Sequence, residues 1–110
     1  MHYNYANFLR DTSKFNLAKY HYREALKLWP NYPSALNNLG TIIENDIEAQ
    51  EQHFLAAIRF SDQHLNAHFN LGQLYRFVLF LILIQTKLIL CSIQFNFFSS
   101  LERSFFVVFF

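Results

Sequence analysis

Cysteine, glycine and proline are scarce in this sequence of 110 residues. The single cysteine, Cys91, excludes an intrachain disulfide framework and a cysteine-based zinc site. Two glycines leave no room for a glycine-rich phosphate loop, and two prolines with few turn residues argue against a small all-β domain. A formal net charge of +1 excludes a strongly basic nucleic-acid-binding surface and the high charge typical of a disordered chain. We therefore expect a helical protein that binds no nucleic acid.

Charged residues are almost absent from the last third of the chain. Residues 77–110 contain only Lys87, Glu102 and Arg103 as charged residues, yet they hold nine of the fourteen phenylalanines. Both glycines and both prolines lie in residues 1–76. The sequence therefore predicts two regions, a segment 1–76 and a hydrophobic tail 77–110.

An internal repeat organises residues 1–76. Residues 2–7 resemble residues 36–41 at an offset of 34, and these resemble residues 68–73 at an offset of 32. A second block repeats at the offset of 32, and it pairs Phe15, Tyr22, Ala25, Leu26, Leu28 and Pro30 with Ile47, Phe54, Ala57, Ile58, Phe60 and Asp62. Repeats of this length are typical of stacked helix pairs.

Each block has the periodicity of an amphipathic helix. Apolar residues recur at steps of three and four, so the sequence predicts helices near 2–10, 14–28, 34–44, 47–60 and 65–76. Asp11, Thr12 and Ser13 are N-cap candidates for the second helix, and Pro30 ends it. No helix breaker separates the last helix from Phe77–Ile84, so that helix can continue into the tail.

These features resemble the tetratricopeptide repeat. That family places a small residue where the two helices of a pair cross, and Ala6, Gly40 and Gly72 occupy this position. The resemblance implies an all-α helix-turn-helix solenoid with two repeats, at about 1–32 and 33–64, and the first helix of a third at 65–76. About three repeats are needed for a stable array, so we expect a piece of a longer solenoid.

Within the tetratricopeptide proteins, residues 2–11, 20–28 and 34–41 are similar to the transmembrane and tetratricopeptide-repeat family. That resemblance implies a fragment of an endoplasmic-reticulum membrane enzyme that transfers mannose from a dolichyl-phosphate donor to serine or threonine. The repeats would then bind a protein or peptide. The alternative is a cytoplasmic scaffold or co-chaperone adaptor, although its carboxylate-binding version would need more basic residues on the concave face than Arg10 and Arg76 supply.

No catalytic constellation is evident, and we expect neither a cofactor nor a metal site. His64 and His68 are four residues apart and can share a helix face, but the sequence supplies no third ligand nearby. Any enzymatic activity would therefore belong to the full-length family and not to residues within this chain.

The better candidate site is a ladder of asparagines on the concave face. Asn4, Asn38 and Asn70 occupy equivalent positions in three repeats. An amide both donates and accepts, so such a ladder can pair with the backbone of an extended peptide. The sequence predicts a peptide-binding site formed by Asn4, Asn7, Asn38, Thr41, Asn70 and Gln73. The alternative is that each asparagine satisfies a local backbone carbonyl between helices.

The tail has two interpretations. Residues 77–93 form an apolar stretch interrupted by Lys87, and a membrane-spanning helix needs about 20 mostly apolar residues. Insertion of this stretch is therefore marginal, and the second stretch, Phe105–Phe110, is too short to span a membrane. The favoured interpretation is translation past an exon edge into A/T-rich sequence, since the repeat stops abruptly at Arg76. Contact with a membrane would otherwise come through 77–93 or through other regions of the parent protein.

Overall fold

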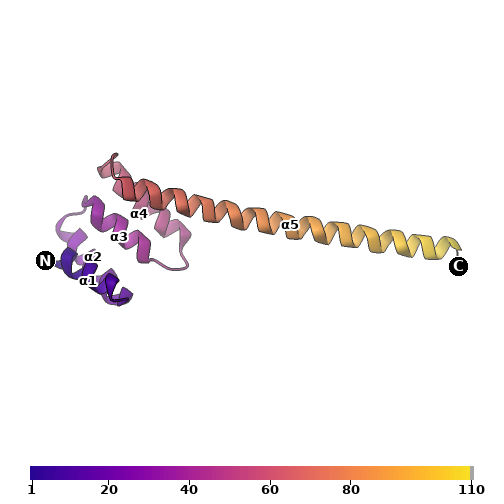
Figure 1. Ribbon diagram of the computed structural model, residues 1–110, viewed down its shortest axis with the longest axis horizontal. Coiled ribbons are helices and arrows are strands. Elements are labelled where there is room, and N and C mark those ends of the chain that lie inside the picture. The colour runs from indigo at the N-terminus through magenta and orange to yellow at the C-terminus, as the bar shows by residue number, and fades with distance from the viewer. Residues whose placement is uncertain (110) are drawn as a thin grey trace. The chain divides into compact units, whose positions relative to one another are not determined.

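The computed structural model describes the backbone of residues 1–109 and the side chains of residues 1–103, so the side chains of Phe105–Phe110 lie outside the described residues. It contains five helices, and no strand occurs in the described backbone. They are α1 (His2–Asp11), α2 (Phe15–Leu28), α3 (Pro33–Ile42), α4 (Ile47–Phe60) and α5 (Leu65–Phe109) (Figure 1). Helix α1 packs against α2, and α3 packs against α4 and α2. These hairpins fit a helical repeat followed by an apolar helix, which confirms the predicted all-α fold.

All five helix starts lie within one residue of the predicted positions, and three of them, those of α1, α4 and α5, coincide with the prediction. Pro33 lies in the first turn of α3, where its missing N–H and fixed φ are tolerated. Helix α3 ends at Ile42 instead of residue 44, because Ile43 adopts an extended backbone with φ −76° and ψ 125°. Helix α5 continues far past Arg76, as the absence of a breaker predicts.

The turn before α2 differs from the prediction. Lys14, not Asp11, Thr12 or Ser13, precedes the helix, and no side chain caps it. The Thr12 hydroxyl instead donates to the carbonyls of Phe8 at 3.0 Å and Leu9 at 3.2 Å, while Ser13 adopts a positive φ of 62°. These residues complete the C-terminus of α1. A true cap occurs at α4, where Asp46 Oδ1 accepts from the Ala49 N–H at 2.9 Å.

The structure divides into two compact units, Met1–Tyr75 and Arg76–Phe110. The core of the first unit is formed by small and large apolar residues of α1, α2 and α3: Ala6, Leu9, Ala18, Tyr22, Ala35, Leu39 and Ile42. A second cluster joins Leu36 of α3, Ala57 of α4 and Ala67 of α5. The start of α5 therefore packs on the second hairpin. The assignment of residues 77–110 as an anchor or as translated non-coding sequence stays a prediction.

In the second unit, the side chains that the structure describes are almost all exposed. By length and composition, residues Leu65–Arg103 of α5 can cross a membrane, with a mean hydropathy of 2.0 over an 18-residue window that has no part buried. The Thr86 hydroxyl donates to the Ile82 carbonyl at 2.8 Å, so this polar side chain is satisfied within the helix. Such a helix fits a membrane protein.

The small residues of the repeat lie where the first two helix pairs cross. Ala6 is fully buried in the core with Ala18 and Tyr22 of α2. A Cβ built on Gly40 would lie only 2.7 Å from Cε1 of Phe54 in α4, which no real Cβ contact tolerates. The prediction that Ala6 and Gly40 sit at helix crossings is thus confirmed.

Candidate functional site

The six predicted site residues form two rows on the first helices of the repeats. Asn4, Asn38 and Asn70 are one row, and the equivalent residues Asn7, Thr41 and Gln73 follow three positions later on α1, α3 and α5. Residues i and i+3 of a helix share a face. Asn4, Thr41 and Gln73 are exposed, whereas the other three are half-buried. We call these six residues the polar strip.

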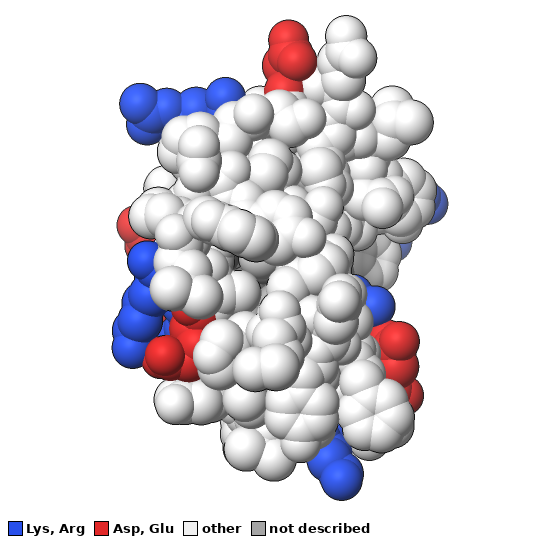
Figure 2. Space-filling view, turned by 90° about the vertical axis from the view of Figure 1, so that its left-hand side faces the viewer, with Lys and Arg blue, Asp and Glu red and all other residues white. Residues whose placement is uncertain are grey.

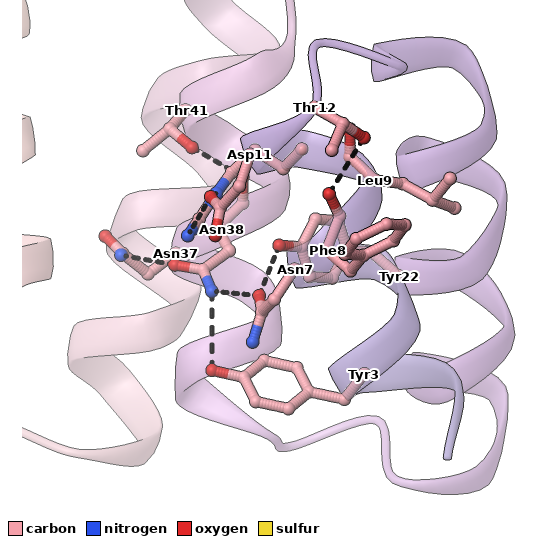
Figure 3. A network of polar contacts seen from close by, with 11 residues as sticks. Tyr3, Asn7, Phe8, Leu9, Asp11, Thr12, Tyr22, Asn37, Asn38 and Thr41 are labelled. Carbon is pink, nitrogen blue, oxygen red and sulfur yellow. Dashed lines mark hydrogen bonds and ion pairs between the residues drawn. The ribbon is translucent and has the colours of Figure 1, made fainter.

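Within the strip, Asn38 joins the first helix of one repeat to that of the next. Its Nδ2 donates to Asn7 Oδ1 at 3.0 Å and to the Tyr3 hydroxyl oxygen at 3.3 Å (Figure 3). The Tyr22 hydroxyl also donates to Asn7 Oδ1, at 2.5 Å. The side-chain oxygen of Asn7 therefore accepts hydrogen bonds from both α2 and α3.

The same connection recurs between the second and third repeats. Asn70 Nδ2 of α5 donates to Asn37 Oδ1 of α3 at 2.9 Å. Asn37 occupies the position in the second repeat that Tyr3 occupies in the first. Asn70 occupies the position in the third repeat that Asn38 occupies in the second. Asn38 and Asn70 thus each donate to the residue at one fixed position of the preceding repeat. The partners are side chains and not backbone carbonyls.

Sequence analysis did not predict this use of Tyr3 and Asn37, although both directly precede an asparagine of the first row. Asn37 is only 3% exposed. Its Nδ2 donates to Asn38 Oδ1 at 3.3 Å, so both ends of its amide are bonded. A buried amide without such partners would cost stability, and within the described residues no buried side-chain polar atom lacks one. The inter-repeat contact is therefore fully satisfied.

Other polar groups of the strip stay available to a ligand. No hydrogen bond within the described residues engages Asn7 Nδ2, Asn70 Oδ1 or the amides of Asn4 and Gln73. The Thr41 hydroxyl donates to the Asn38 carbonyl at 2.6 Å, which leaves its oxygen free to accept. The strip consequently offers donors and acceptors on α1 and α5, and the Thr41 hydroxyl oxygen as an acceptor on α3.

The electrostatics of the strip favour a neutral ligand. None of its members is charged, and Arg10 near its end is paired with Asp11 at 3.0 Å. Burial raises the pKa of Tyr22 above its ordinary value, against the lowering effect of Arg10. The phenol therefore stays protonated at neutral pH and remains a donor to Asn7.

An apolar pocket of about 250 Å³ lies where α1 begins and α2 ends. It is lined by Met1, His2, Tyr3, Ala25, Leu28, Trp29 and Tyr32. Figure 2 views the left-hand side of Figure 1, where the N-terminus lies, and shows the charged side chains mainly around the margin of this face. Sequence analysis missed the pocket, because the turn 29–32 that closes it has no counterpart of similar composition in the second repeat.

The two histidines considered as metal ligands have structural partners. His64 Nδ1 accepts from the Ala67 N–H at 3.1 Å, so it caps the start of α5. His68 Nε2 lies 2.7 Å from the Asp62 carbonyl oxygen. Among the described residues, no group of three metal-ligating side chains occurs.

Comparison with known proteins gives two curated relatives. Over 50 residues, 46% of the chain, the sequence is 58% identical to protein O-mannosyl-transferase TMTC1 from Homo sapiens, and it is equally similar to TMTC1 from Mus musculus. The chain spans only 6% of the human protein's length and 5% of the mouse protein's. No protein-family model matches the sequence.

Proposed function

Because the chain contains a segment of the TMTC family of protein O-mannosyl-transferases, we propose that residues 1–75 are a tetratricopeptide-type segment that binds an extended peptide. The polar strip is the proposed binding surface. Its ligand is a protein segment whose backbone amides pair with the side chains of Asn7, Thr41 and Gln73, while Asn38 and Asn70 hold neighbouring repeats together.

The observation that carries this proposal is the regular spacing of uncharged hydrogen-bonding groups. Each first helix supplies two of them at equivalent positions, and the bonds from Asn38 and Asn70 fix these helices side by side. An extended backbone presents donors and acceptors at regular intervals along its length. A neutral, periodic strip matches such a backbone better than it matches a charged side chain or terminus.

The role in the parent protein follows from the relatives. TMTC1 is named as a protein O-mannosyl-transferase and is much longer than this chain. We propose that the segment holds an acceptor polypeptide for the transferase of an endoplasmic-reticulum membrane protein. The TMTC1 relatives and the apolar helix α5 both fit a membrane protein.

A binding experiment with a backbone-modified probe tests the proposal. The full chain in detergent micelles is titrated with a fluorescein-labelled, serine- and threonine-rich peptide, and with the same peptide N-methylated on alternate backbone amides. Asn7→Ala and Gln73→Ala should each weaken binding by roughly two- to twelve-fold, which corresponds to about 0.5–1.5 kcal/mol for one hydrogen bond. The unsubstituted chain should also bind the N-methylated peptide more weakly than it binds the unmodified peptide.

Asn16→Ala is the matched control, since Asn16 is an exposed asparagine of the second helix α2 and lies outside the strip. It should leave the affinity unchanged. Equal affinity for the N-methylated and unmodified peptides would show that the strip does not bind a backbone, and the proposal would then be wrong.

A further inference from the structure

The face of α5 around Gly72 lies open, although the same face of the other two first helices is covered. A Cβ built on Gly72 meets no heavy atom within 4 Å, whereas one built on Gly40 meets the ring of Phe54 at 2.7 Å. His68 and Tyr75, one helical turn to either side of Gly72, are also exposed, and Leu71 is half-buried. The third repeat therefore exposes the surface that the first two bury.

The chain itself shows twice what covers this surface. Helix α2 covers α1 and helix α4 covers α3, and each is an amphipathic helix of 14 residues. Each has an aromatic residue at its eighth position, Tyr22 or Phe54, and an alanine three residues later, Ala25 or Ala57. All four are buried. Both covering helices thus share one pattern. An aromatic ring lies against the small residue of the first helix, and an alanine three residues later permits close approach of the two backbones.

We propose that the Gly72 face is a docking site for an amphipathic helix of this pattern, supplied by another polypeptide. Its aromatic ring would lie on Gly72, and its alanine would pack beside the ring. The site continues the interface that α4 makes with α3, because α5 already packs on this hairpin through Ala67 and Asn70. At one edge of the face the Tyr75 hydroxyl donates to Glu51 Oε1 of α4 at 2.5 Å, so α4 borders the site and holds the Tyr75 side chain.

This proposal does not rest on peptide binding by the polar strip. Gln73 and Asn70 of the strip lie on another side of α5 than Gly72 and Tyr75, given about 3.6 residues per turn. Failure of one site leaves the other intact, and each has its own probe.

The test uses a fluorescein-labelled peptide with the sequence of residues 15–28, which carries the pattern of Ala18, Tyr22 and Ala25, and the full chain in detergent micelles. Gly72→Leu should abolish binding of the peptide, because the leucine side chain occupies the place of the peptide's aromatic ring. Gly72→Gln should also abolish binding, and it adds no apolar surface. Tyr22→Ala in the peptide alone should weaken binding roughly ten-fold or more, because a buried aromatic anchor carries much of the free energy of a contact. Asn66→Leu, an exposed substitution six positions before Gly72 on another side of α5, should have no effect.

Unfolding of the variants without peptide shows whether they fold. A leucine or glutamine in place of Gly72 should leave the midpoint of unfolding unchanged or raise it, since glycine is the poorer helix former and its position is open. Three outcomes overturn the proposal: unchanged peptide binding by both Gly72 variants, a lowered midpoint that shows the face is covered by the chain's own residues, or a change from dimer to monomer in sedimentation that identifies a second copy as the occupant.

Discussion

Asn38 connects two repeats through a single amide. Its nitrogen donates to Asn7 and Tyr3 on α1, and its oxygen accepts from the buried Asn37. Removing one member of such a network leaves the remaining groups without partners, and an unsatisfied buried group costs about 1–3 kcal/mol. The residue therefore acts first on the stacking of the repeats, and only through that stacking on a ligand.

At the residue scale, Asn38→Ala should lower the free energy of unfolding by about 1–3 kcal/mol, because it leaves Asn37 and Asn7 underbonded. Asn4→Ala is the matched comparison. Asn4 occupies the equivalent position but is exposed, so this change should stay within about 0.5 kcal/mol. Urea unfolding followed by circular dichroism measures both. Equal effects of the two substitutions would show that the inter-repeat bonds contribute nothing to stability.

The sequence alone does not predict most of these side-chain contacts. The equivalence of Asn4, Asn38 and Asn70 is visible as a repeat, and so are the small residues at the helix crossings. The partners are not visible, because Tyr3 and Asn37 are different residue types that play the same part. Only the hydrogen bonds in the folded structure show that these side chains of neighbouring first helices meet.

At the scale of the elements, apolar periodicity and proline predict the helix boundaries. They do not predict the hydrogen bonds of the turn between α1 and α2. Thr12 was a plausible cap for α2, yet its hydroxyl bonds back to α1, since serine and threonine satisfy either the preceding or the following helix. Asp46 does cap its helix, because its side chain accepts a hydrogen bond from the free Ala49 N–H in the first turn of α4. Local sequence alone does not decide between these two uses.

Helix α5 has one charge in the middle of its apolar stretch. Lys87 in a bilayer centre costs about 2.5–3.5 kcal/mol on insertion scales, which offsets the contribution of several leucines and isoleucines. Lys87→Leu should therefore raise the inserted fraction of the full chain in microsomes, as measured by an engineered glycosylation site on either side of residues 77–93. Gln85→Leu, two positions away, removes no charge and should raise it less. An inserted fraction that does not respond to Lys87→Leu would contradict the assignment of this stretch as a marginal membrane segment.

At the scale of the whole molecule, the first unit, Met1–Tyr75, contains the three first helices, and hydrogen bonds from Asn38 and Asn70 join each to the next. Two apolar clusters, one across α1 to α3 and one across α3 to α5, hold this arrangement. The sequence repeat was sufficient to predict it, since each helix pair buries its apolar face only against its neighbours. The apolar pocket at the start of α1 was not predictable, because it depends on how one turn, 29–32, closes over the helix ends.

The most direct test of the proposed function is a nuclear magnetic resonance titration of the full chain in detergent micelles with the serine- and threonine-rich peptide. The side-chain amide signals of Asn7 and Gln73 should shift, because Asn7 Nδ2 and the Gln73 amide make no hydrogen bond within the described residues and belong to the proposed binding surface. The indole signal of Trp29, the only tryptophan, should stay in place, since it reports on the apolar pocket. A shift of the Trp29 indole with no change at Asn7 and Gln73 would place the peptide in the pocket and contradict binding along the polar strip.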